Sequence, residues 1–158
     1  MTLQTQRPTP TTLIVTRHFA APPARVWAAH MEPALIQQWL LGPDGWTMPV
    51  CENDTRPGGK IRYEWREPAT GHGFSMTGTY ELVDAPHRSI HIEQMHLPDP
   101  TPENRVETRF DADGTGTLLT MTMTVADAAT MEAMISSGMT DGMETSYKRL
   151  ESLGFATA

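Results

Sequence analysis

A series of alternating segments between Trp46 and Val125 limits the possible folds more than any other feature of the chain. In KIRYEWR, at residues 60–66, Ile61, Tyr63 and Trp65 fall on one face and the charged residues fall on the other. This two-residue period is typical of a strand that buries one face in an antiparallel sheet. The period recurs in FSMTGTYEL (74–82), SIHIEQM (89–95), VETRF (106–110) and LLTMTMTV (118–125). The series predicts an antiparallel sheet.

The segments before and after this series add one strand and three helices. TLIVTRHF is rich in β-branched residues and predicts a strand over Leu13 to Phe19. Prolines at positions 22, 23 and 33 mark the starts of two short helices, and Gly42-Pro43 ends the second. The expected order is one strand, two short helices, six strands and one long helix, with an extended loop over HLPDPTPEN (96–104).

Two glycines interrupt the expected long helix over Met131 to Leu153. A helical projection places Gly138 and Gly142 in the middle of its broad apolar face. Glycine inside a helix costs about 1 kcal/mol relative to alanine, so both positions need a reason. Either the glycines let a strand or an aromatic ring pack closely against the helix, or they leave room for a hollow. The pattern alone favours neither explanation.

Charge and composition exclude several classes of protein. A net charge of −7 argues against nucleic acid as the main partner. No run of about 18 apolar residues is present, so no membrane span is expected. The start, MTLQTQRPTPTT, lacks the apolar core of a signal peptide, and the single cysteine, Cys51, suits a cytoplasmic protein. Residues 1–11 are expected to be a disordered lead, and residues 12–158 a single domain.

Four segments resemble, in order, the landmarks of one protein family. They are TRHFAAPPARVWAAHMEPALIQQWL, GPDGWTMPVCENDTRPGGKIRYEWR, GTYELVDAPHRSI and SSGMTDGMETSYKRLESL. Over about residues 12–154, the chain is similar to the bacterial branch related to the C-terminal domain of the activator of the heat-shock-protein-ninety ATPase. That branch lies within the SRPBCC (START-like) superfamily. The run from Asp54 to Gly59, ahead of an aromatic strand, carries the strongest part of the resemblance.

The resemblance implies an α+β helix-grip fold, in which a curved, seven-stranded antiparallel sheet wraps around a long C-terminal helix. Two short helices after the first strand would support the open side of the sheet. The resemblance also implies a cavity between sheet and helix, because the superfamily generally has one. Its members include lipid carriers, metabolite binders, polyketide cyclases and a chaperone regulator, so the fold does not decide the function.

A soft, aromatic set of side chains is expected to line that cavity. Methionine and aromatic side chains suit apolar ligands, and they gather on the inferred inner face. The expected lining residues are Trp46, Met48, Tyr63, Trp65, Phe74, Met76, Tyr80, Gln94, Met121, Met123, Met134, Gly138, Met139 and Gly142. The same side chains would equally fill an ordinary core, and this remains the competing interpretation.

Three polar residues share the inferred inner face, namely Arg17, Glu52 and Gln94. Each could orient a ligand by a hydrogen bond or a charge. Glu52 alternates with Met48 and Val50, so a buried Glu52 could act as an acid or a base on a bound molecule. It is the one catalytic candidate, although residues near strand ends commonly bond to backbone or water instead.

No metal or cofactor site is expected. The six histidines show neither H-x-x-H nor HExxH spacing, and Cys51 is the only thiol. The RPGG glycines lead into a strand and not into a helix N-terminus, so they form no phosphate-binding loop.

The leading hypothesis is a non-catalytic protein that encloses a small apolar or aromatic molecule, such as a lipid. The short helices around Trp27 and Trp39 and the 96–104 loop would form the gate. Two alternatives stay open. One is a co-chaperone-like interaction module with a chaperone partner and a role in the stress response. The other is an aromatase- or cyclase-like enzyme acting on a bound apolar substrate. A homodimer is neither predicted nor excluded.

Overall fold

The computed structural model describes residues 2–154, which form an α+β fold. In chain order the elements are β1 (Gln4–Thr9), β2 (Thr12–Phe19), α1 (Pro23–Met31), α2 (Pro33–Trp39), β3 (Thr47–Asn53), β4 (Lys60–Arg66), β5 (Gly73–Asp84), β6 (Arg88–Leu97), β7 (Asp99–Pro100), β8 (Asn104–Asp113), β9 (Gly116–Thr124), α3 (Ala128–Ser136) and α4 (Met139–Ser152). This order matches the expected one, with two added strands and a break in the C-terminal helix.

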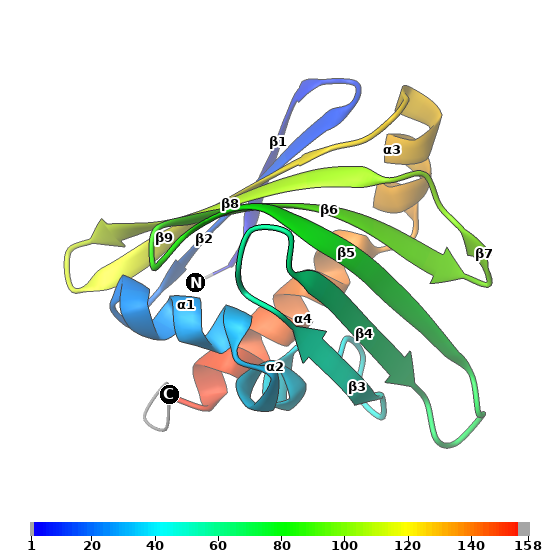
Figure 1. Ribbon diagram of the computed structural model, residues 1–158, viewed down its shortest axis with the longest axis horizontal. Helices are drawn as coiled ribbons and strands as arrows, with labels where there is room; N and C mark the ends of the chain where they lie inside the picture. Colours follow the sequence, from blue (N-terminus) through cyan, green and yellow to red (C-terminus); the bar gives the residue numbers. More distant parts are fainter. Residues whose placement is uncertain (1, 155–158) are drawn as a thin grey trace.

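One antiparallel sheet holds all of these strands. Its order is β1-β2-β9-β8-β6-β5-β4-β3, and the two-residue β7 pairs with β6 at the side. Helices α1, α2 and α4 lie together on one face of the sheet (Figure 1). This face is called the inner face below, and the opposite one the outer face. The arrangement confirms the predicted helix-grip fold class, and the seven expected strands are β2, β3, β4, β5, β6, β8 and β9.

Strand β1 corrects the prediction of a disordered start. It pairs antiparallel with β2, from Gln4 opposite Thr16 to Thr9 opposite Thr12. All six of its side chains are exposed, so the segment has no apolar period that a sequence pattern could reveal. Backbone hydrogen bonds to β2 hold the strand, helped by an ion pair of 2.8 Å between Arg7 and Glu132.

The predicted long C-terminal helix is two helices that meet at Gly138. The backbone of Gly138 has a φ of 83°, in the left-handed region that favours glycine, and this residue caps the start of α4. The prediction of one continuous helix over Met131 to Leu153 is therefore wrong. The break could not be seen in the sequence because the apolar period resumes after the bend. A pattern of side chains does not register a change in backbone direction.

Most of the buried apolar side chains of residues 2–154 form two clusters. The larger one packs α1, α2 and the second half of α4 against the sheet and includes Trp39 and Tyr147. The smaller one lies among β2, β8, β9 and α3 and includes Met131. Met121 and Met143 are only partly buried and pack against both clusters. The apolar core therefore has two parts, which Met121 and Met143 connect.

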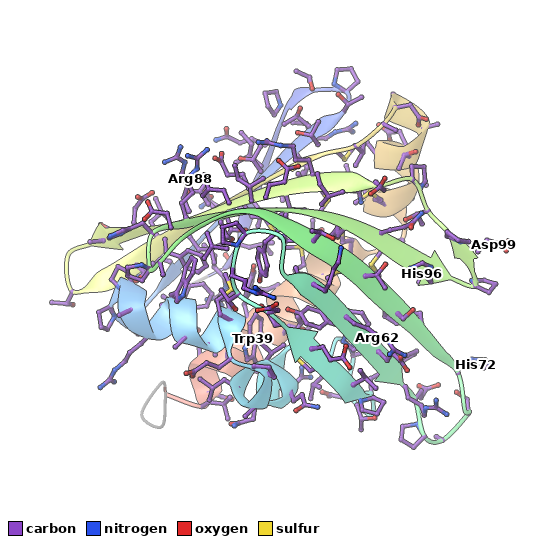
Figure 2. All side chains as sticks on the ribbon, viewed as in Figure 1. Trp39, Arg62, His72, Arg88, His96 and Asp99 are labelled. Carbon is purple, nitrogen blue, oxygen red and sulfur yellow. The ribbon has the colours of Figure 1, made fainter. Side chains whose placement is uncertain are left out.

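The two short helices are fixed parts of the core, which argues against the expected gate. Trp27 and Trp39 keep only 8% and 2% of their exposure. Trp39, labelled in Figure 2, also donates its indole N–H to the carbonyl of Ala29 at 2.9 Å. Side chains that are packed on all sides and hydrogen-bonded cannot swing open without disrupting the larger cluster.

A buried arginine ties α4 to the sheet. The side chain of Arg17, on β2, has no exposed area. Its Nε and Nη2 donate to the two carboxylate oxygens of Glu144 at 3.0 Å each, and its Nη1 donates to Glu151 at 2.7 Å. The bonds from Arg17 hold the pKa of Glu144 below its usual range. Arg17 faces inward as predicted, but two carboxylates neutralise its charge, so it anchors α4 and is not free to bind a ligand.

His30, on α1, lies among aromatic rings. Its ring centroid is 4.9 Å from that of Trp39 and 5.3 Å from that of Phe110. Nδ1 donates to the carbonyl of Val26 at 2.7 Å, whereas Nε2 is buried without a hydrogen-bond partner among the described residues. Burial lowers the pKa of His30 to about 4. The ring is therefore neutral in the folded protein at physiological pH.

We expect the free energy of unfolding to fall as the pH drops from about 6.5 towards 4, by up to about 3 kcal/mol from His30 alone. In this range the histidine of the unfolded chain takes up a proton and the buried ring does not, so acid favours the unfolded state. His30→Phe keeps the space filled and removes this proton uptake. Urea unfolding of both proteins at about pH 7 and about pH 5 measures the difference. Equal losses in the two proteins would contradict the prediction.

Candidate functional site

One row of residues crosses the inner face of the sheet from β3 to β8. The hydrogen-bond register places Asn53 opposite Ile61, and Ile61 opposite Gly78. Gly78 lies opposite Glu93, and Glu93 lies opposite Asn104. Ile61 belongs to the larger buried cluster, which identifies the row as inward-facing. The row therefore carries polar side chains at both ends and no side chain in its middle.

Strand β6 turns a histidine–carboxylate pair toward this face. His91 lies opposite Tyr80 on one neighbouring strand and Val106 on the other, and both of these are buried. Its Nε2 donates to Glu93 Oε1 at 2.7 Å, and the two side chains keep 16% and 13% of their exposure. Because a carboxylate oxygen accepts, Nε2 carries the hydrogen of this bond. The pair thus faces the helices without being fully covered by them.

An asparagine links two tyrosine hydroxyls beside this pair. Asn53 Nδ2 donates to the Tyr63 hydroxyl at 2.8 Å, and the Tyr80 hydroxyl donates to Asn53 Oδ1 at 3.0 Å. The ring of Tyr80 meets that of His91 edge-on, with centroids 5.9 Å apart. Burial raises the pKa of Tyr80 to about 12 and also raises the pKa of Tyr63. Both phenols are therefore neutral hydrogen-bonding groups at physiological pH.

Asn104, at the start of β8, is the polar residue of the row whose hydrogen-bonding groups have the fewest partners in the protein. It is 2% exposed, and its Nδ2 makes one long contact of 3.9 Å with Met134 Sδ. Its Oδ1 is buried and has no hydrogen-bond partner among the described residues. A buried acceptor without a partner costs about 1–3 kcal/mol. Asn104 Oδ1 is thus a free acceptor on the inner side of the sheet.

The expected lining residues divide into buried and half-buried ones. Met48, Tyr63, Met76, Tyr80 and Met123 are at most 7% exposed. The half-buried ones are Trp46, Trp65, Phe74, Met121, Met134, Gly138, Met139 and Gly142. Burial of this kind fits core packing and ligand contact alike. Ligand binding by these residues therefore stays a prediction.

Glu52 does not face the interior, contrary to the expectation. The pairing of β3 with β4 shifts register between Thr47 and Val50, which is a β-bulge. Beyond the bulge Cys51 packs against the larger cluster, whereas Glu52 is exposed on the outer face. One inserted residue reverses which side chains point inward, so uniform alternation assigned the wrong face. Glu52 has no position from which to act on a molecule in the interior.

Gln94 also lies on the outer face. It pairs with Thr77, and its side-chain amide donates to the carbonyl of Thr101 at 2.8 Å. On β6 the usual pattern is inverted, because Ile92 faces outward while His91 and Glu93 face inward. The prediction took the isoleucines of this strand as its inward-facing residues and therefore assigned the wrong face. The two-residue spacing of His91 and Glu93 shows that they share a face, but not which face it is.

Neither glycine of the C-terminal helices is explained by close packing. A Cβ added at Gly138 or Gly142 would meet nothing within 4 Å. The positive φ of Gly138 accounts for that residue, but Gly142 lies inside α4. Of the two explanations that the sequence leaves open, close packing is therefore wrong. The missing side chain at position 142 leaves open space beside α4.

Gly142→Ala is expected to raise the free energy of unfolding by about 0.5–1 kcal/mol, because alanine favours a helix and its methyl group meets no other atom. Gly138→Ala is the matched control and is expected to lower stability by about 1 kcal/mol, because alanine avoids the left-handed region. Urea unfolding of both variants measures the two effects. A loss of stability in Gly142→Ala would show that the space beside α4 is occupied.

The outer face carries a separate groove over β4, β5 and β6, with a volume of about 590 Å³. The charged side chains of the outer face that line it are Glu52, Lys60, Arg62, Glu81 and Glu103. Arg62, labelled in Figure 2, pairs with Glu64 beside it. Helices α1, α2 and α4 lie on the opposite side of the sheet (Figure 1). The groove suits a polar partner better than an apolar molecule.

Within residues 2–154, no group of three or more His, Cys, Asp or Glu side chains could hold a metal ion. No helix in the same range is long and apolar enough to cross a membrane. His91 and Glu93 form a pair, and the residue beside Glu93 in its row is the amide Asn104.

Comparison with known proteins identifies the family. The family described as "Activator of Hsp90 ATPase homolog 1-like protein" matches residues 20–154. The chain belongs to this family. A crystal structure from Rhodobacter sphaeroides is similar with a TM-score of 0.91 and 33% identity, over 97% of each chain. One from Mycobacterium smegmatis gives 0.84 and 25%, over 98% of each chain. No curated protein sequence gives a significant match.

Membership of the Hsp90 ATPase activator homologue family confirms the resemblance seen in the sequence. The matched residues 20–154 include the whole inner row from Asn53 to Asn104. An AHSA1-like protein from Aeromonas hydrophila shares the fold at 20% identity, with a TM-score of 0.72, over 92% of this chain and 96% of that one. At that identity the likeness concerns the fold alone.

Proposed function

We propose that this protein binds a small, largely apolar molecule between the inner face of the sheet and α4. One observation carries the proposal: the polar groups that face the helices there are either partly exposed or lack a hydrogen-bond partner. His91 and Glu93 keep part of their exposure, and Asn104 Oδ1 is buried without a partner among the described residues. In a filled core, neighbouring side chains would cover such groups and bond to them.

The side chains around these polar groups suit an apolar molecule. Met95 and Met121 on the sheet and Met139 and Met143 on α4 are all half-buried at the edges of the two clusters. Methionine adapts its shape to a partner more readily than branched residues do. Gly142 adds open space on the helix side. A molecule that buries about 200 Å² of apolar surface there would gain about 5 kcal/mol before the costs of association.

Native mass spectrometry of freshly purified protein tests this function. We expect a small adduct that denaturing extraction releases and that Gly142→Leu, which fills the space beside α4, abolishes. Gly142→Ala is the control, because its methyl group leaves most of that space open and the adduct is expected to persist. An adduct that survives Gly142→Leu unchanged in the folded protein would place its site elsewhere and contradict the proposal.

A second candidate is a chaperone contact through the outer face. The family description names an activator of the Hsp90 ATPase, and the outer groove offers a charged surface. Stimulation of a bacterial Hsp90 ATPase by this protein, lost on reversing the charge of Lys60 and Arg62 together, would support it. Glu52, the one candidate acid of the cyclase-like alternative, lies on the outer face, which argues against that alternative.

A further inference from the structure

We infer that the molecule bound at the inner face is an amphiphile with a hydrogen-bond-donating head group, an amine or a hydroxyl on an apolar chain or ring, and not a carboxylate such as a fatty acid. The inference rests on the proposed binding function and defines the chemistry of the ligand.

The head-group end of the site offers acceptors. Glu93 and Asn104 lie directly opposite one another on β6 and β8, so their Cβ atoms are about 4.5–5.5 Å apart. Among the described residues only His91 bonds to the Glu93 carboxylate, through Oε1. The Oδ1 of Asn104 has no partner at all there. A donor placed between the two residues would satisfy a buried acceptor that the protein leaves open, and an ammonium group would also meet a carboxylate.

Within residues 2–154, no interior lysine or arginine is free to bind a carboxylate. The one fully buried cation, Arg17, is already held by Glu144 and Glu151. Arg149, beside α4, donates to the carbonyls of Trp39 and Gly42. Apart from these two and Arg88, which pairs with Glu107, the lysines and arginines of residues 2–154 are exposed. A carboxylate head group would therefore lie beside Glu93 without a compensating positive charge.

Methionines of α3 and α4 offer a place for the apolar tail. Met134 on α3 contacts the amide of Asn104 through its sulfur. Met139 and Met143 follow on α4 and pack against the smaller cluster. A tail that leaves the polar row would thus lie along methionines, with Gly142 providing room. The sheet would thus bind the head group, and the helix would contact the tail.

Three probes with similar tails and different head groups test the inference, namely decylamine, 1-decanol and decanoate. Each is titrated calorimetrically at about pH 7.5, decylamine and decanoate below their critical micelle concentrations and 1-decanol below its solubility limit. We expect decylamine to bind most tightly, 1-decanol next and decanoate at least about 10-fold more weakly than decylamine. Glu93→Gln is expected to remove the advantage of the amine over the alcohol. Glu81→Gln is the matched control, because it changes the net charge equally on an exposed side chain of the outer groove.

Each outcome decides the inference. If the three probes bind with equal affinity, or if decanoate binds best, the inference about the head group is overturned, while the binding function stays in place. Failure of all three probes to bind would overturn the binding function as well. An amine advantage that Glu81→Gln and Glu93→Gln reduce equally would reflect the overall negative charge and overturn the assignment to Glu93. If Glu93→Gln does not fold, Asn104→Leu is used in its place. This variant is expected to weaken the binding of 1-decanol at least about 10-fold, and an unchanged affinity would overturn the inference.

Discussion

Replacing Glu144 and Glu151 together by glutamine is expected to lower the free energy of unfolding by about 3–5 kcal/mol. The guanidinium of Arg17 has no exposed area, and these two carboxylates neutralise it at 2.7–3.0 Å. Without them the fold must keep a buried positive charge away from water, or expose it by releasing α4 from the sheet. Urea unfolding at neutral pH measures the loss.

The triple variant Arg17→Met, Glu144→Gln and Glu151→Gln separates charge from packing. Replacing a complete buried ion pair with apolar groups is often close to neutral, whereas removing one side of it is not. We therefore expect the triple variant to regain most of the stability that the double variant loses. A triple variant as unstable as the double one would show that the contacts, and not the stranded charge, cause the loss.

Gly142→Leu is expected to weaken the binding of 1-decanol by about 10–100-fold. A leucine side chain at this position of α4 would occupy the space that a Cβ finds empty. Overfilling a packed site typically costs about 1–3 kcal/mol, which corresponds to this range of affinity. Calorimetric titration of the variant and of the unchanged protein measures the ratio.

Gly142→Ala is again the control for this prediction, because it changes the helix propensity while adding one methyl group. It is expected to keep the affinity for 1-decanol within about 3-fold while raising stability. If Gly142→Leu folds and binds 1-decanol as well as the unchanged protein, the space beside α4 is not part of the site.

The fold could be predicted from the sequence because its period has a direct physical cause. Strands such as β4 bury one face, so Ile61 and Tyr63 alternate with charged residues, and turn residues separate the strands. The prolines at the starts of α1 and α2 mark helix entry in the same local way. Strand β1 gives no such signal, because backbone hydrogen bonds hold it and all its side chains are exposed.

The site could be predicted much less well, because its polar residues depend on register between strands. The β-bulge in β3 moves Glu52 outward, and no residue type in that strand indicates the presence of the bulge. On β6 the isoleucine Ile92 lies on the outer face, so His91 and Glu93 occupy the positions that apolar residues usually hold. The lack of a partner for Asn104 Oδ1 is a property of the assembled fold and leaves no trace in the sequence.

The most direct test of ligand binding between the sheet and α4 is an NMR titration of protein labelled with ¹³C at the methionine methyl groups, using 1-decanol. Binding there is expected to shift the signals of Met121, Met139 and Met143 with saturation. The signals of Met31 and Met131, which are packed inside the two clusters, are expected to move little. Saturable binding that leaves the first three signals unmoved would contradict binding between the sheet and α4, and it would place the molecule outside the inner face.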